Sequence, residues 1–479
     1  MGARKIAVTV GIFLLVAVGI GSWQWWRWQH PQLLLDPNAI IDENRTYDLE
    51  IWVEIGDGLV VAPPLDDRIW SEIITAFQST YPNTQVFFKP IERVNLPQAM
   101  KTALGQGRPP HILLESSEWF APWSDLQLPI DRFLPPEARD NYFQGALAKV
   151  TLQEGTMAWP SLVMPRVWVA NGQMWNRLGA AAPSHGLSIG EGLTWTDASW
   201  RDLKEGLKTI KLPQPAIALQ KGSPDTLVQI LVAASKGLVS STGELLVTEA
   251  LIQDVLNEYQ AQQEDKFISL VQGTLLTDFL SGRRGIIGPV GIWFWSLGEN
   301  AKGRGYRSVK IPEDTVLVPA PGGAGQGGYL GGSMVQVAVF RHRRFQGQAH
   351  ARLTMELARE LSGKIALEMG RQRLGVPADK TLIDEWRVAT ELDIGQRENL
   401  MAVLESAVGL EPLPLKWHGA RRRLIEEILE PVLDDYVNGR SAGELIGGNL
   451  PENLPGKLIQ AMERLLEGVR GESPQGKRR

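Results

Sequence analysis

The sequence contains no cysteine, and this absence excludes two kinds of feature. Its 479 residues can form no disulfide framework and no lipid anchor on a cysteine after a leader segment. Its six histidines show no pair at metal-ligand spacing on an expected helix. His342 and His350 lie eight residues apart across a turn, and we interpret both as surface residues. We therefore expect no metal site and no cofactor, and any membrane tether must be a helix of the chain itself.

The chain also has no excess of basic charge. Its net charge is −5, whereas nucleic-acid binding requires a clustered basic face. Hydrophobic residues make up 43% of the chain and charged residues 22%, which is typical of a globular protein. Because 479 residues exceed what one hydrophobic core usually supports, we expect two lobes and no nucleic-acid partner.

Signatures of catalysis are weak. The segment from Gly186 to Gly190 has the spacing of a nucleophile elbow, but the residues before it predict no strand. The glycines from Gly323 to Gly328 are spaced like a dinucleotide fingerprint, but a strand follows where a helix is needed. Carboxylates are plentiful, yet no motif places the pair that a glycan-cleaving enzyme requires. We expect a protein that is not an enzyme, with a glycan-cleaving enzyme kept as a weaker alternative.

The N-terminus has the charge order of an export signal or a membrane helix. Arg4 and Lys5 precede an apolar stretch over 6–21, and four tryptophans follow that stretch closely. An indole suits the membrane interface because its body is apolar and its N–H is polar. We favour an uncleaved signal or membrane anchor over 1–28 and a linker over 29–46, with cleavage as the alternative. The rest of the chain is then extracytoplasmic, and is periplasmic or secreted if the signal is cut.

Strand and helix patterns alternate along the rest of the chain. In residues 48–53 apolar and polar positions alternate, and after Asp66 or Asp67 the apolar residues recur at helical spacing until Tyr81. This alternation predicts mainly parallel sheets flanked by helices. Further strands are expected over 85–91, 111–115, 167–170, 284–287, 315–318 and 334–340. Further helices are expected over 97–104, 199–210, 224–236, 249–262, 348–361, 421–437 and 454–466.

Tryptophan is unusually common, with 17 residues against 12 phenylalanines and seven tyrosines. Trp70 and Trp200 fall on expected amphipathic helices, so we interpret them as packing residues. Trp119, Trp293 and Trp295 instead follow expected strands in loops rich in glycine and proline. A sugar ring has apolar C–H faces and a hydroxyl rim, so flat aromatic side chains with a few polar groups suit it. Open parallel sheets bind ligands at the carboxyl edge, where these loops are expected.

A series of short sequence phrases recurs in a characteristic order along the chain. The phrases include FQSTYPNTQV at 77–86, LPIDRFL at 128–134, GTMAWP at 155–160, FLSGRRGIIGPVG at 279–291 and GVPA at 375–378. In this order they resemble the extracellular solute-binding proteins of ABC transporters, in particular the carbohydrate-binding group that includes maltose-binding protein. The resemblance covers about Tyr47 to Leu466 and implies a two-lobed periplasmic-binding-protein fold of type II, with a hinge between the lobes and closure around the ligand. The implied lobes are 47–163 with 335–376, and 164–334 with 377–470.

The resemblance and the strand-end residues together give a set of expected ligand contacts. Arg166 pairs either with an acidic sugar or with a nearby carboxylate, and both interpretations stay open. The resemblance implies that the chain crosses between the lobes a second time near residues 329–335. Glycines there allow unusual backbone angles and close ligand approach. The expected set is Glu54, Asp57, Glu115, Ser116, Trp119, Trp159, Arg166, Trp293, Trp295, Gly331, Gly332 and Ser333.

The sequence therefore predicts a monomeric carbohydrate receptor outside the cytoplasmic membrane. Its expected partners are an oligosaccharide, the permease subunits of an ABC transporter and the membrane that its N-terminal helix enters. The alternative is a protein of the same fold that reports its ligand to a membrane sensor.

Overall fold

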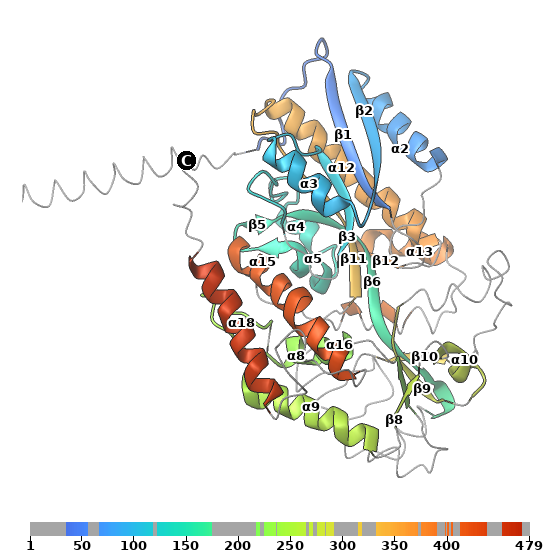
Figure 1. Cartoon of the computed structure of the whole chain (residues 1–479). Helices are drawn as coiled ribbons and strands as arrows, with labels where there is room; N and C mark the ends of the chain where they lie inside the picture. The colour runs from blue at the N-terminus through green and yellow to red at the C-terminus, as the bar shows by residue number, and fades with distance from the viewer. Residues whose placement is uncertain are drawn as a thin grey trace, which may run out of the picture.

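The computed structural model describes most of the chain as two groups of helices and strands joined by one long strand (Figure 1). The described residues are 35–55, 67–117, 122–174, 217–220, 225–235, 237–264, 268–271, 275–282, 284–291, 315–318, 332–371, 375–389, 398, 400–401, 404–405, 412–437 and 453–471. The predicted N-terminal anchor, the linker as far as residue 34 and the predicted helix over 199–210 lie outside them. Within the described part, no helix has the length and apolar character needed to cross a membrane.

The first lobe begins with three parallel strands. Strand β1 (Tyr47–Ile55) lies between β2 (Thr84–Glu92) and β3 (Ile112–Ser117). Helices α2 (Asp67–Thr80) and α3 (Leu96–Gly105) form the connections between these strands. The alternating apolar residues of β1 are fully or almost fully buried, as the sequence pattern predicts. All five elements are thus confirmed to within a few residues.

The sheet continues through β11 and β6 into the second lobe. Strand β11 (Gly332–Val339) pairs antiparallel with β3 and with β6 (Ala158–Asn171). The first half of β6 also pairs with β12 (Val376–Pro377), and its second half pairs with strands of the other lobe. Figure 1 shows β6 running from one group of elements into the other. Because β6 is shared by both sheets, it is the structural link between the lobes.

The second lobe repeats the pattern with a smaller sheet. Parallel strands in the order β9, β7 and β8 extend from β6, and β10 pairs with β6 at the same end. The predicted strands and helices that the structure describes are confirmed here, and β7, β8 and α10 are additional. The elements are β7 (Ile217–Gln220), α8 (Asp225–Ala234), α9 (Glu249–Glu264), β8 (Ile268–Val271), α10 (Leu275–Leu280), β9 (Ile286–Gly291) and β10 (Thr315–Val318).

Helices after β11 cover both lobes. The long helix α12 (Gln348–Arg371) packs against β6 and β11, and α13 (Ile383–Ala389) packs against α12. Trp386 of α13 is almost fully buried, and its indole donates to the carbonyl of Gly375.

The C-terminal helices pack on the second lobe. They are α15 (Leu415–Arg423), α16 (Glu430–Val437) and α18 (Leu454–Gly471), with the π-helical segment Leu424–Leu429 between the first two. Short elements complete the described fold: α4 (Pro136–Arg139), α5 (Gln144–Val150), β4 (Thr151–Leu152), β5 (Gly155–Thr156) and the 3₁₀ turn Lys380–Leu382.

Each lobe has its own hydrophobic core. The first core gathers around β1, β3, β6, β11 and α12, and the second around α8, α9, α15 and α18. Trp70 packs in the first core with its ring centroid 4.4 Å from that of Phe88, which confirms its predicted packing role. Two separate cores agree with the expectation from chain length. The detailed lobe boundaries stay a prediction.

The prediction of surface histidines is wrong for His350. Its side chain is 6% exposed, His342 is half-buried, and both lie against His111, with ring centroids 4.4 Å apart for His111 and His342 and 4.6 Å for His111 and His350. The Nε2 atom of His350 lies 3.0 Å from the carbonyl oxygen of Asp48. Because α12 begins beside β1, a histidine in the first turn of this helix is buried against the first lobe.

Candidate functional site

The carboxyl ends of β1 and β3 bring three predicted site residues together. Glu54 lies one residue before the end of β1, and Glu115 and Ser116 lie in the last half of β3. All three side chains are buried, at 3%, 7% and 6% exposed. The backbone N–H of Ser116 donates to Glu54 Oε2 at 2.8 Å, which joins the two strand ends. This is the edge at which open parallel sheets bind ligands.

Two further residues complete this group, which we call the edge cluster: Glu54, Glu115, Ser116, Trp123 and Gln336. The indole N–H of Trp123 donates to both carboxyl oxygens of Glu115, at 3.0 and 3.1 Å. Gln336, on β11, donates from Nε2 to Glu115 Oε1 at 3.2 Å. The position of Gln336 was missed from the sequence, although one glutamine inside the apolar strand SMVQVAVF is a signal that something polar faces it.

The edge cluster contains buried polar atoms that no hydrogen bond satisfies. They are Glu54 Oε1, Ser116 Oγ and Gln336 Oε1. Arg93 Nε lies 3.4 Å from Glu54 Oε1 as an ion pair, but without hydrogen-bond geometry. A buried polar group without a partner costs about 1–3 kcal/mol, so such atoms are rare in folded proteins. Three such atoms at one sheet edge are typical of a binding site in which a ligand supplies the missing hydrogen bonds.

Burial also changes the acidity of the two carboxyls. Burial raises the pKa of Glu115 to about 7, the nearby Glu54 charge raises it further, and the Trp123 and Gln336 donors lower it. Burial likewise raises the pKa of Glu54, against the lowering effects of the Ser116 N–H and of Arg93. Arg422, on α15, lies near enough that its charge lowers the pKa of both. A helix of the second lobe thus brings a cation toward the edge cluster, a placement that no local sequence signal predicts.

Other predicted residues lie at the strand that links the lobes. Gly332 and Ser333 begin β11 and pair with Pro165 and Met164 of β6. Gly332 has a φ of 101°, which favours glycine and agrees with the unusual backbone angle expected there. Its carbonyl accepts a hydrogen bond from the buried ammonium of Lys149 at 2.6 Å.

The remaining predicted contacts are not part of the edge cluster. Trp159 is 1% exposed and lines a cavity to which no residue of the edge cluster belongs. Arg166 pairs through its backbone with Gly291 of β9, and its side chain lies outside the described residues. Asp57, Trp119, Trp293, Trp295 and Gly331 also lie outside them and stay predictions. Among the residues that the structure describes, no group of three or more acidic or histidine side chains is placed to hold a metal ion.

Comparison with known proteins gives a fold but no close relative. The sequence matches no protein-family model, and it matches no curated protein. Solved structures do match: the sugar-binding protein MalE from Xanthomonas citri aligns over 88% of this chain and 98% of its own, with a TM-score of 0.58 and 15% identity. The chain has a type II periplasmic-binding-protein fold.

Two more structures with this binding-protein fold show how far the likeness extends. The GacH receptor of Streptomyces glaucescens, solved alone and with acarbose, aligns over 88% of this chain and 99% of its own at 14% identity, with a TM-score of 0.54. The Thermus thermophilus maltotriose-binding protein, bound with maltotriose, aligns over 88% and 100% at 12% identity, with a TM-score of 0.51. At these identities the similarity shows the fold of the aligned part of the chain.

Proposed function

We propose that the protein is an extracytoplasmic solute receptor that captures an oligosaccharide between its lobes and delivers it to an ABC permease. The observation that carries this proposal is the set of unsatisfied buried atoms in the edge cluster. The binding-protein fold supports it, because similar structures include receptors of acarbose and of maltotriose. The predicted N-terminal helix would hold the receptor on the outer face of the membrane.

The chemistry of the edge cluster suits a sugar hydroxyl. A hydroxyl donates one hydrogen bond and accepts two. It can therefore bond both to the unsatisfied acceptor oxygens and to the unsatisfied hydroxyl donor of the edge cluster. Glu54 Oε1 and Gln336 Oε1 would accept from ligand hydroxyls, and Ser116 Oγ would donate to one. The nearby cation of Arg422 would strengthen acceptance by the two carboxylates.

The predicted loop tryptophans would add apolar platforms to this polar edge. In our proposal Trp119 stacks on one side of the sugar and Trp293 or Trp295 on the other, as the lobes close. Closure would then bring groups of the second lobe onto a ligand already held by the first. The closed form is the one that a permease would recognise.

Titration of the full chain with maltotriose and a panel of α- and β-linked oligosaccharides tests this proposal. We expect saturable heat in calorimetry and a change in tryptophan fluorescence with at least one oligosaccharide, both lost in Glu54→Gln. The control is Glu72→Gln on α2, because Glu72 is 69% exposed in a surface ion pair with Arg68. Absence of a response to every oligosaccharide would refute the carbohydrate receptor.

A cellular assay separates delivery from sensing. If the protein serves a permease, deletion of its gene abolishes uptake of the oligosaccharide that binds. If it reports to a membrane sensor, uptake persists while the transcriptional response to that oligosaccharide disappears.

A further inference from the structure

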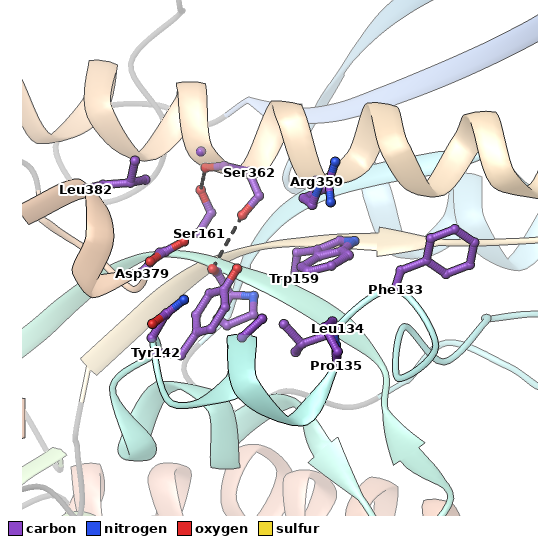
Figure 2. Close-up of a pocket in the computed structure, with 14 residues that line it drawn as sticks. Phe133, Leu134, Pro135, Tyr142, Trp159, Ser161, Arg359, Ser362, Asp379 and Leu382 are labelled. Carbon is purple, nitrogen blue, oxygen red and sulfur yellow. Dashed lines mark hydrogen bonds between the residues drawn. The ribbon is translucent and has the colours of Figure 1, made fainter. Parts of the chain in front are cut away.

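A cavity lies in the first lobe, between α12, the start of β6 and the segment after β12 (Figure 2). Its volume is about 270 Å³. Trp159 and Ser161 of β6 both line the cavity. This part of β6 packs on α12, because Ser161 Oγ donates to the carbonyl of Ser362 at 2.6 Å. No residue of the edge cluster lines this cavity.

Two opposite charges line the cavity without pairing with each other. Arg359 comes from α12, and within the described part of the chain it forms no ion pair or hydrogen bond. Asp379 follows β12 and accepts from the backbone N–H and the hydroxyl of Thr381, at 2.9 and 2.7 Å. Both charges act on the hydroxyl of Tyr142: burial and the Asp379 charge raise its pKa, and Arg359 lowers it. Tyr142, Arg359 and Asp379 thus line one cavity, and both charges act on the tyrosine hydroxyl.

Two neutral donors face the same space with their hydrogen-bonding capacity unused. Tyr142 is 6% exposed, and its raised pKa keeps the hydroxyl protonated. In the described part of the chain this hydroxyl has no hydrogen-bond partner, and the buried Nε1 of Trp159 has none either. Figure 2 shows the Trp159 indole beside Arg359, with Tyr142 on the other side of the cavity. An acceptor atom of a ligand would offset the cost of about 1–3 kcal/mol for the buried indole N–H.

The rest of the lining combines an apolar wall with the polar residues Asn141, Ser161 and Ser362, and the hydroxyls of both serines already donate to backbone carbonyls. The apolar wall is the larger part. It consists mainly of Phe133, Leu134, Pro135, Ala138 and Leu382. A neutral sugar would neutralise neither Arg359 nor Asp379 and would place hydroxyls against this wall. A simple carboxylate would satisfy Arg359 but would be repelled by Asp379. A molecule that carries both charges on an apolar body matches all three features.

We propose that this cavity binds a small zwitterion of the α-amino-acid type with an apolar side chain. Its carboxylate lies against Arg359 and accepts from Tyr142 or Trp159. Its ammonium lies against Asp379. Its side chain packs against the apolar wall formed by Phe133, Leu134 and Leu382. The site is separate from the edge cluster and does not depend on the proposed carbohydrate ligand.

Calorimetric titration of the full chain with four probes tests the proposal. L-phenylalanine carries both charges, 3-phenylpropionate lacks the ammonium, 2-phenylethylamine lacks the carboxylate, and glucose is neutral. We expect saturable binding of L-phenylalanine or, for a smaller site, L-leucine, and at least tenfold weaker binding of the other probes. Equal binding of 3-phenylpropionate would overturn the role of Asp379, and preferred binding of glucose would overturn the zwitterion. No heat with either amino acid at millimolar concentration would overturn the site.

Substitutions of the two charged lining residues test whether the amino acid binds in this cavity. Arg359→Gln is expected to weaken amino-acid binding at least tenfold, and Asp379→Asn to do the same while its amide oxygen can still accept from Thr381. Arg371→Gln is the matched control, because Arg371 lies on the same helix but pairs with Glu368 and Glu385 outside the cavity. Thermal melts establish that each variant is folded. Unchanged amino-acid affinity in Arg359→Gln, or an equal loss in Arg371→Gln, would refute the assignment, and Glu54→Gln should leave this affinity unchanged.

Discussion

The two ends of strand β3 both bury polar side chains, but they differ in how completely those side chains are hydrogen-bonded. Before the strand, His111 Nδ1 accepts from the Glu50 N–H at 2.9 Å, and its Nε2 lies 3.0 Å from Gln346 Oε1. At the carboxyl end, Ser116 Oγ and, on the neighbouring strand β11, Gln336 Oε1 have no hydrogen-bond partner. In our proposal the amino end is a structural joint and the carboxyl end binds the ligand. Because polar side chains are buried at both ends, the number of unpaired buried atoms, and not burial, distinguishes the two proposed roles.

The largest effect is expected from a substitution at the amino end of β3, where the buried histidine is hydrogen-bonded through both ring nitrogens. His111→Ala removes the acceptor of the Glu50 N–H and leaves a space beside His342 and His350. We expect a loss of about 3 kcal/mol in the free energy of unfolding, measured by urea denaturation. Oligosaccharide affinity of the folded variant should stay unchanged. A loss below about 1 kcal/mol, or a selective loss of sugar binding, would contradict the structural role.

At the carboxyl end the expected effect is on binding. Glu115→Gln keeps the shape of the side chain but removes its charge and one acceptor for the Trp123 indole. We expect at least a tenfold loss of oligosaccharide affinity, or about 1.4 kcal/mol, measured by calorimetry with the oligosaccharide that binds best to the wild-type chain. Stability without ligand at neutral pH should not fall, because the variant no longer buries a charge. Loss of stability with intact affinity would reverse the assignment of the two ends.

The two ends should also respond to pH with opposite signs. Burial lowers the pKa of His111 from 6.5 to about 3, so the unfolded chain binds the extra proton and stability falls as pH falls through that window. Burial raises the pKa of Glu115 from 4.5 to about 7, so the folded chain binds the extra proton and stability rises as pH falls from 7 to 4.5.

Urea midpoints measured at intervals from pH 7.5 to pH 4 separate these contributions. Glu115→Gln should lose stability more steeply than wild type on acidification, and His111→Gln less steeply. Parallel profiles for the three proteins would show that neither group titrates as the structure implies.

The sequence predicted the local elements well because their signals are local. Residues 315–318 were predicted as a strand and form one with the same bounds, and β1 to β3 differ by one or two residues. Helix α12 was predicted to end at Leu361, before Ser362 and Gly363, but it continues to Arg371. Leu361, Ile365 and Met369 are buried against the first core, and this packing outweighs the weak helix propensity of the glycine.

The candidate site was less predictable because it is assembled across the sheet. Glu54, Glu115 and Ser116 were predicted from their positions at strand ends, and these ends do meet. Gln336 and Arg422 reach the same place from distant segments, so only the fold brings them there. The histidine cluster was missed for the same reason.

The smallest expected effect compares two serines of equal burial. Ser116, 6% exposed, has an unpaired Oγ, whereas Ser235, 7% exposed, donates to the carbonyl of Leu231 at 2.6 Å and accepts from the N–H of Leu238 at 3.1 Å. Without ligand, Ser116→Ala should raise the free energy of unfolding by up to about 1 kcal/mol, because it removes an unsatisfied buried hydroxyl. Ser235→Ala should lower it by about 1–2 kcal/mol, because the Leu238 N–H loses its acceptor. Equal destabilisation in urea would mean that Ser116 is hydrogen-bonded in the free protein, and the carboxyl end of β3 would then be as complete a joint as the amino end.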